Sequence, residues 1–383
     1  MASLFHPLCG SNPDVLIKLL LANGPVAANR WPQVAIALAV SFARWPFSTA
    51  EQAFFRVRSP DSVATPMPDP IFIVGYWRSG TTHLHNLMAE SQQFGYITPL
   101  ATGLPWDILG IVRALEPLLQ KALPQDRYVD NVAVTPTSPQ EDSIPLATMG
   151  VDSYYHGLYF PQHFEAHFRR DVFQSADAET DDKTAPKDAK KRWQRLHCHL
   201  LKKVSIHQKR KPLLIKNPVY TGYIRHLREI WPQAKFIHIY RNPYRVFPST
   251  QHYFTRLLPE LALQSYEVDD LPIEPLIFES YAYLMRSLKA DTADLPPQQF
   301  YELSFEDLQA NPIRELEALF QQLELSNFRI ARPYLESYLT DLKGYQQNQY
   351  DLDTEIIKKI ETHWNFQIQQ WGYKAPAASP LDV

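Results

Sequence analysis

Residues 71–82 constrain the fold of this chain more than any other stretch. Residues 71–74 are all apolar, a pattern typical of a parallel strand that is covered on both faces. Gly75 and Gly80 bracket a short loop, and good helix formers follow it. A strand, a Gly-flanked loop and a helix start place several backbone N–H groups around one point, next to the positive end of the helix dipole. The stretch therefore predicts a phosphate-binding loop in an α/β fold.

The loop differs from the loop of nucleotide hydrolases at one decisive position. It has the G-x-x-x-x-G spacing of a Walker A motif, but Thr81 stands where that motif has Lys. Enzymes that act on ATP or GTP need this Lys on the β- and γ-phosphates. Here the cation is Arg78, before the second Gly, and Ser79 follows it. Two alternatives stay open for the loop alone: a P-loop kinase or hydrolase that has lost its Lys, and a Gly-rich turn without a ligand.

Two further buried strands are predicted downstream, and a basic residue stands at the end of each. Residues 213–215 lead into Lys216, and residues 236–240 lead into Arg241. Open α/β sheets bind ligands at the carboxyl ends of their strands. Ser249 follows Arg241 by eight positions, on a predicted helix. A guanidinium and a hydroxyl placed in this way can converge on one phosphate.

The segment between these two strands supports the same architecture. Thr221 is expected to cap a helix whose apolar residues recur at helical spacing. The strand at 236–240 ends in a cation and not in the acid of a Walker B motif. This ending argues against the kinase or hydrolase alternative.

Together these blocks resemble a known family. The R-S-G-T-T loop is similar to the 5′-phosphosulfate loop of sulfotransferases, and the R-x7-S pair to their 3′-phosphate site. The L-x-K-N-P and R-N-P-Y-R-V-F-P-S-T runs resemble a bacterial sulfotransferase family that is related to the tyrosylprotein sulfotransferases. The resemblance implies an α/β, P-loop-type three-layer fold with a central parallel sheet flanked by helices. It implies 3′-phosphoadenosine 5′-phosphosulfate (PAPS) as co-substrate, and no metal.

The resemblance also implies which residues hold the donor. Five loop residues would bind the 5′-phosphosulfate: Arg78, Ser79, Gly80, Thr81 and Thr82. The 3′-phosphate would be bound by Arg241 and Ser249, with a cation and a backbone N–H added by Lys343 and Gly344. The alternative for the last two is a solvated turn. Lys216 would meet charge on the bridging oxygen, and its alternative is a structural Lys at a strand end.

The general base is less well indicated. Glu141 and Asp142 lie in an S-P-Q-E-D block that the bacterial relatives also carry, and Glu141 is the preferred candidate. A carboxylate beside an apolar acceptor pocket can take the proton of an alcohol. The alternative is that the pair only caps the helix that follows. His83 is a further candidate, because it is nearest to the sulfuryl group by sequence.

The expected domain organisation is an N-terminal helical extension with its connector over residues 1–66 and a sulfotransferase domain over 67–383. A charged insertion near 171–191 is expected to be exposed and mobile. The apolar run at 34–43 is too short for the ~20 residues of a membrane-spanning helix. Helices at about 14–22 and 32–44 either pack on the core or lie in a membrane interface.

Composition fits an ordinary enzyme. The chain has 383 residues and a net charge of −3, without the basic stripe that nucleic-acid binding requires. Two cysteines cannot form a disulfide framework, so a cytoplasmic location is expected. The His197–His199 run is not expected to bind metal, because i and i+2 positions of a helix do not face together. Aromatic residues at 156–164 favour a small hydrophobic or amphiphilic, lipid-like acceptor. A non-catalytic, membrane-associated relative is the remaining alternative.

Overall fold

The computed structural model describes residues 6–62, 67–114, 116, 135, 137–173, 189–341 and 352–376. The chain forms two compact units. The first comprises Met1–Asp69, Gly95–Ile215 and Arg256–Leu271. The second comprises Pro70–Phe94, Lys216–Thr255 and Pro272–Val383.

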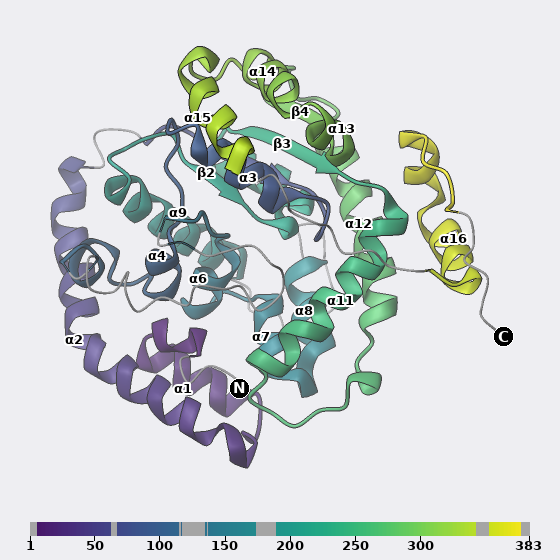
Figure 1. Ribbon diagram of the computed structural model, residues 1–383. Helices are drawn as coiled ribbons and strands as arrows, with labels where there is room; N and C mark the ends of the chain where they lie inside the picture. The colour runs from purple at the N-terminus through teal and green to yellow at the C-terminus, as the bar shows by residue number, and fades with distance from the viewer. Residues whose placement is uncertain are drawn as a thin grey trace. The chain divides into compact units, whose positions relative to one another are not determined.

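Four strands form one sheet, in the order β2-β1-β3-β4 (Figure 1). Their bounds are β1 Ile71–Val74, β2 Leu214–Lys216, β3 Lys235–Tyr240 and β4 Phe300–Ser304. Strand β3 pairs in parallel with both β1 and β4. All residues of β1 and β2 are buried, as the apolar runs indicate. The predicted α/β fold, a parallel sheet flanked by helices with an N-terminal helical extension, is confirmed.

The second unit places helices after each of its strands. They are α3 Thr81–Glu90, η6 Pro218–Gly222, α10 Ile224–Ile230, α11 Pro243–Leu261, α12 Ile273–Thr292, α13 Phe305–Ala310, α14 Pro312–Gln322, α15 Phe328–Asp341 and α16 Thr354–Trp371. The part of α11 from Arg256 onward belongs to the first unit. An aromatic cluster forms part of the core. Trp364 is fully buried, stacks on Tyr281 at 4.0 Å, and donates its indole N–H to the Phe278 carbonyl at 3.1 Å. This cluster holds α16 against α12.

The first unit is helical apart from its share of β2. Its elements are η1 Pro7–Gly10, α1 Pro13–Ala22, η2 Ala28–Arg30, α2 Trp31–Ser62, α4 Pro99–Gly103, η3 Ile108–Val112, α6 Ser143–Thr148, α7 Tyr154–Tyr159, η5 Pro161–His163, α8 Phe164–Val172, α9 Ala189–His207 and η7 Val268–Asp270. Among the described residues, no helix is both long and apolar enough to cross a membrane. Most of the predicted insertion, 174–188, lies outside the described residues.

The N-terminal helices are longer than predicted. Helix α1 matches the expectation, but α2 continues to Ser62 instead of ending at 44, so the expected connector is largely helical. Pro46 stands inside α2. A Pro in a helix removes one backbone hydrogen bond and bends the helix without always ending it, and α2 changes direction along its course (Figure 1). Helix formers such as Ala50, Glu51 and Gln52 then continue it.

Candidate active site

The loop after β1 is built around glycines that no other residue could replace without strain. Gly75 has φ 143°, and a β-carbon added to it would lie 2.4 Å from the Ile239 carbonyl oxygen. Its N–H donates to the Thr221 hydroxyl at 2.8 Å. Thr221 was expected to cap a helix, and that expectation is wrong, because Tyr223 occupies the cap of α10. The Thr221 hydroxyl instead anchors the loop.

The second glycine closes the loop against an aromatic ring. Gly80 has φ 102°, and an added β-carbon would lie 2.3 Å from the Phe305 ring. Between the glycines, Arg78 adopts φ 66°, a left-handed conformation that costs free energy for a residue with a side chain. The Ser79 hydroxyl donates to the Tyr76 carbonyl at 2.8 Å, and Ser79 is buried. The loop is therefore a tight, strained turn whose shape is set before any ligand binds.

The side chain of Arg78 meets the residues of the R-x7-S motif. Its Nε donates to the Ser249 hydroxyl at 3.0 Å, although the two residues are 171 positions apart. Arg241 Nη1 donates to the Arg78 carbonyl at 3.3 Å. Ser249 is buried, and its helix, α11, follows β3 directly. Arg78, Arg241 and Ser249 thus form one connected cluster at the carboxyl ends of β1 and β3. The resemblance assigns Arg78 to one end of the donor and the other two residues to the opposite end.

Phe305, which the sequence analysis did not single out, is the shared wall of this cluster. The Arg241 guanidinium carbon lies 4.5 Å from the centre of its ring, a cation–π contact. The His83 ring lies 6.0 Å from the same ring. Phe305 begins α13, immediately after β4 ends. Its place at a strand end is the one signal that could have identified it.

Lys216 is the last residue of β2 and is buried, with a relative exposure of 6%. The next residue, Asn217, donates its N–H to the Ile73 carbonyl at 3.3 Å and accepts the Val219 N–H at 3.0 Å on its side chain. The K-N-P block is thereby held beside β1, one strand away from the glycine loop. This position at the carboxyl edge of the sheet is the one that the sequence predicts.

His83 lies in the first turn of α3, next to the loop. Burial lowers the pKa of its imidazole below the ordinary value of 6.5. The ring is therefore uncharged at neutral pH, and one of its nitrogens has a lone pair that can accept a proton. Backbone N–H groups in the first turn of a helix have no partner within the helix, so this end of α3 can bind an anion.

Glu141 and Asp142 lie in the first unit and have different surroundings. Glu141 Oε1 accepts hydrogen bonds from the hydroxyls of Tyr155 at 2.8 Å and Tyr154 at 3.3 Å. Asp142 has no exposed side chain, and its Oδ2 lies 3.6 Å from His197 Nδ1. Asp142 stands at the N-cap of α6 but makes no capping hydrogen bond. The alternative that its side chain caps this helix is therefore wrong.

Two further residues are predicted to bind the 3′-phosphate. Lys343 and Gly344 lie outside the described residues. Near the cluster, Glu306 on α13 accepts hydrogen bonds from the Asn242 N–H at 3.1 Å and from the Tyr373 hydroxyl at 2.8 Å, and these contacts are structural. Within the part of the chain that the structure describes, no group of three or more His, Cys, Asp or Glu side chains is placed to hold a metal ion.

The Sulfotransferase family model matches residues 70–329 of this chain. The omega-hydroxy-beta-dihydromenaquinone-9 sulfotransferases Stf3 of Mycobacterium bovis and Mycobacterium tuberculosis are each 31% identical to it over 375 residues, which are 97% of this chain and 92% of the relative.

Solved structures show the same fold. The sulfotransferase STF1 of Mycobacterium tuberculosis superposes with a TM-score of 0.61 at 16% identity, covering 91% of this chain and 90% of STF1. The sulfotransferase STF9 of Mycobacterium avium gives 0.64 at 14% identity, covering 94% of this chain and 96% of STF9. The glycine loop, the R-x7-S pair and the K-N-P block all lie within the matched region, and the chain belongs to the sulfotransferase family.

Proposed function

We propose that this sulfotransferase takes the sulfuryl group of PAPS and transfers it to a hydroxyl of a hydrophobic, lipid-like acceptor. The observation that carries the donor assignment is the contact between Arg78 and Ser249, 3.0 Å from Nε to Oγ. It joins the glycine loop to the R-x7-S motif, which are far apart in the sequence. A loop for a 5′-phosphosulfate beside a site for a second phosphate suits a doubly phosphorylated adenosine.

The donor would be held by charge and by backbone N–H groups. Arg78, Ser79, Gly80, Thr81 and Thr82 would face the 5′-phosphosulfate, and Arg241 and Ser249 the 3′-phosphate. The Arg241 guanidinium is stacked on Phe305, so its fork is pre-oriented for a two-pronged contact with phosphate oxygens. Because Arg78 also reaches Ser249, we infer that it lies between the two phosphate positions and contributes to both.

The reaction requires positioning and charge stabilisation. The acceptor oxygen forms a bond to sulfur while the bond from sulfur to the bridging oxygen of PAPS breaks, leaving adenosine 3′,5′-bisphosphate. The acceptor hydroxyl loses its proton to a base. Lys216 would stabilise the negative charge that grows on the bridging oxygen, a role in which one group typically contributes about 10²–10³ in turnover. Sulfuryl transfer in this form resembles phosphoryl transfer, where positioning dominates catalysis.

We propose Glu141 as the general base, with His83 as the second candidate. Glu141 is a carboxylate bonded by two tyrosine hydroxyls, and such bonds fix its orientation. His83 is kept uncharged by burial, which also suits proton acceptance. Asp142 is the weakest candidate, because it is fully buried and faces His197. Glu141→Gln and His83→Gln decide between the first two: the variant that loses turnover without losing donor affinity has lost the base.

Two observations support the proposed acceptor class: the names of the relatives and the aromatic side chains of this chain. The relatives that are 31% identical are named for a hydroxylated dihydromenaquinone, a lipid with a long apolar tail. Aromatic side chains are abundant in α7 and α8, where Tyr154, Tyr155, Tyr159, Phe164 and Phe168 gather. A cytoplasmic location remains a prediction.

Incubation with sulfur-labelled PAPS and a detergent-solubilised ω-hydroxylated dihydromenaquinone tests the proposal. We expect label in the lipid and an equal amount of adenosine 3′,5′-bisphosphate. The same quinone without its ω-hydroxyl is the matched control and should stay unlabelled. Label in water-soluble hydroxyl compounds but not in the lipid would contradict the acceptor class. No labelled product from any acceptor would contradict the donor.

A further inference from the structure

From Ser41 to Glu51, helix α2 turns polar side chains inward and leaves large apolar ones exposed, the reverse of an ordinary surface helix. Its buried positions recur at helical spacing and include Ser41, Arg44 and Ser48. The Glu51 side chain follows on the same side, with a relative exposure of 8%. The only charged residues between positions 31 and 54 are Arg44 and Glu51, and both therefore face the protein, together with the hydroxyls of Ser41 and Ser48.

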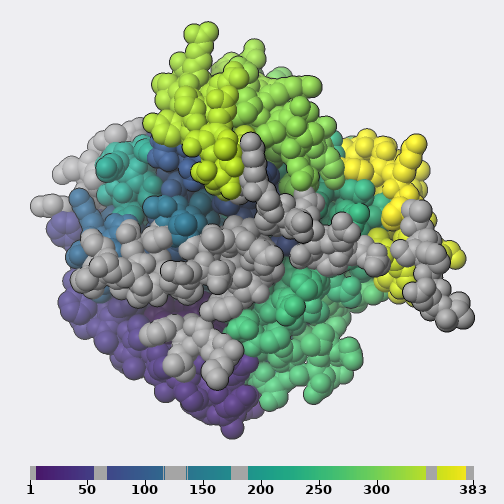
Figure 2. Space-filling model, viewed as in Figure 1, coloured from purple at the N-terminus to yellow at the C-terminus, as the bar shows by residue number. Residues whose placement is uncertain are grey.

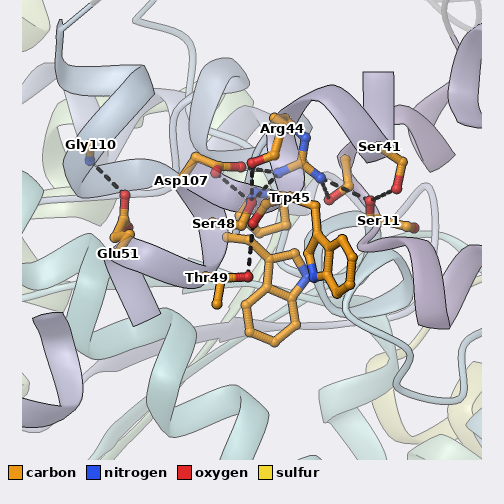
Figure 3. Close-up of polar contacts among 12 residues, drawn as sticks. Ser11, Ser41, Arg44, Trp45, Ser48, Thr49, Glu51, Asp107 and Gly110 are labelled. Carbon is orange, nitrogen blue, oxygen red and sulfur yellow. Dashed lines mark hydrogen bonds and ion pairs between the residues drawn. The ribbon is translucent and has the colours of Figure 1, made fainter. Parts of the chain in front are cut away.

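The inward-facing side chains are held by a buried polar network (Figure 3). Arg44 pairs with Asp107 and donates to the carbonyls of Gly10 at 2.8 Å and Ser11 at 2.9 Å. The Ser48 hydroxyl donates to Asp107 Oδ1 at 2.6 Å. Rotating α2 to turn its apolar side inward would leave these buried charges without partners, at a cost of several kcal/mol. The network therefore fixes which side of the helix faces out.

Glu51 extends the network to two more segments of the same unit. Its carboxylate accepts from the backbone N–H of Gly110 at 2.6 Å and from Lys203 Nζ at 2.5 Å. Lys203 on α9 has no exposed side chain, so this ion pair is buried. Two buried ion pairs, Arg44 with Asp107 and Glu51 with Lys203, thus fix the orientation of α2.

The outward side of α2 carries large apolar side chains. Their relative exposures are 53% for Trp31, 49% for Phe42, 49% for Trp45, 60% for Phe47 and 58% for Phe54. Helix α1 adds Ile17 at 40% and Leu21 at 80%. We call these seven residues the α1–α2 apolar face. They are seven of the ten large hydrophobic side chains that are exposed among the described residues. The N-terminal helices are purple in Figure 2, where part of their outer surface is visible.

The exposed side of α2 carries no charged side chain between residues 31 and 54. Between residues 31 and 54 the helix has only two charged residues, Arg44 and Glu51, and both point inward. Alanines fill the exposed positions between the aromatic residues, at 35, 39, 43 and 50. Protein interfaces usually have a polar rim around their apolar centre. A continuous uncharged strip with Trp and Phe is instead typical of helices that lie in the interface of a lipid bilayer.

We propose that the α1–α2 apolar face docks this enzyme on a lipid bilayer, with α2 lying in the interface rather than crossing it. The helix is not apolar enough to cross a membrane, because its inward side is charged. The proposal rests on the lipid-like acceptor proposed above. An acceptor with a long apolar tail resides in a bilayer, and an enzyme bound to that surface reaches its hydroxyl without drawing the tail through water. Between residues 31 and 54 no cation lies on the exposed side of α2, so we expect binding to depend on burial of apolar surface and not on anionic lipid.

Co-sedimentation with vesicles tests this, using vesicles of phosphatidylcholine alone and of two parts phosphatidylcholine to one part phosphatidylglycerol. The full-length protein should bind both alike, and added salt should not weaken binding. Replacing Trp45 and Phe47 together by Gln should lower the partition coefficient by about tenfold or more. The matched control replaces Ile330 and Tyr334 on α15, which are 60% and 50% exposed, by Gln, and it should bind as the wild type does.

Several outcomes would overturn the proposal. The wild-type protein could fail to sediment with any vesicle, or it could bind only the vesicles that contain phosphatidylglycerol. The two double variants could also lose vesicle binding to the same extent. Light scattering tests a different occupant, a second copy of the chain. If the wild type is a dimer and the double change at Trp45 and Phe47 makes it a monomer, the α1–α2 apolar face is a dimer interface and the membrane proposal is wrong. Unchanged thermal unfolding confirms that each variant is folded. The vesicles contain neither PAPS nor acceptor, so vesicle binding tests only the membrane proposal. Sulfuryl transfer to the detergent-solubilised quinone needs no membrane, so it tests only the proposed function.

Discussion

At the scale of single residues, the proposed donor cluster depends on a few side chains placed at strand ends. Arg78 adopts a left-handed backbone conformation between two glycines, and its side chain spans from the loop to Ser249. Strain of this kind persists only where the surroundings fix it, and it is concentrated at functional sites. The surroundings of the loop therefore fix its shape, as the proposed anion site requires.

Arg241→Ala should weaken the binding of adenosine 3′,5′-bisphosphate by about 1.5–3 kcal/mol, the range for hydrogen bonds to charged groups. The physical reason is the loss of both the charge and the fork that Phe305 orients. Isothermal titration measures the change. Arg245→Ala removes an exposed Arg of the same helix and should leave the affinity unchanged. Unchanged affinity in Arg241→Ala would mean that the 3′-phosphate binds elsewhere.

Lys216→Ala should lower turnover by about 10²–10³ and change donor affinity little, because its proposed partner is a charge that develops only during transfer. Single-turnover kinetics with saturating PAPS separates the two effects. Lys211→Ala, a Lys five positions earlier that is not buried, is the control. A loss confined to donor affinity would reassign Lys216 to ground-state binding.

At the scale of elements, the structure shows which local patterns decide the fold. Strand β1 and the start of α3 lie where the apolar run and the glycines predict them, because these signals are local. The role of Thr221 was missed, since its partner Gly75 is 146 positions away. Phe305 was missed for a similar reason: its contact with Gly80 exists only once β4 lies beside β3. The predicted end of the second helix at 44 was wrong, since tertiary contacts on the inward face accompany the helix beyond that point.

Gly80→Ala should destabilise the glycine loop, because an added β-carbon meets the Phe305 ring at 2.3 Å and the backbone has φ 102°. We expect the free energy of unfolding to fall by about 1–3 kcal/mol, measured by urea denaturation. Gly103→Ala is the matched control, since an added β-carbon there meets nothing within 4 Å and the position is helical. Equal effects of the two substitutions would show that the loop is not tightly packed at Gly80.

His6 makes the N-terminal segment sensitive to acid. Its Nδ1 accepts the Leu8 N–H at 3.1 Å and its Nε2 lies 3.0 Å from the Leu261 carbonyl, which fixes a neutral tautomer. Burial lowers the pKa of His6 from 6.5 to about 4. The unfolded chain therefore binds more protons between pH 6.5 and 4, and the free energy of unfolding falls as the pH falls through this window.

From pH 7 to 5 the loss from His6 should be about 2 kcal/mol, by the relation between pKa shift and stability. Urea denaturation across this range measures it. His6→Gln should flatten the dependence, whereas His163→Gln, which removes an exposed histidine, should keep it. A slope that is the same in wild type and His6→Gln would show that His6 is not the responsible group.

At the scale of the whole molecule, the chain combines a unit that carries the proposed donor site with a helical unit in which part of helix α2 is inverted. The residues of the proposed donor cluster could be singled out from the sequence because they follow strand ends and form contiguous motifs. The inversion of α2 could not, because hydrophobicity alone predicts that its aromatic side faces inward. Only the placement of Asp107 and Lys203 against Arg44 and Glu51 turns that side outward. The predicted domain boundary near residue 66 stays a prediction.

The central claim, a site for a doubly phosphorylated adenosine at Arg78, Arg241 and Ser249, is tested most directly by thermal unfolding with three nucleotides. Adenosine 3′,5′-bisphosphate at ~100 times its dissociation constant should stabilise the protein by about 2.7 kcal/mol. Adenosine 5′-phosphate, which lacks only the 3′-phosphate, should stabilise it much less, and Mg-ATP should not stabilise it. Equal stabilisation by adenosine 5′-phosphate and the bisphosphate, or stabilisation by Mg-ATP alone, would contradict the claim.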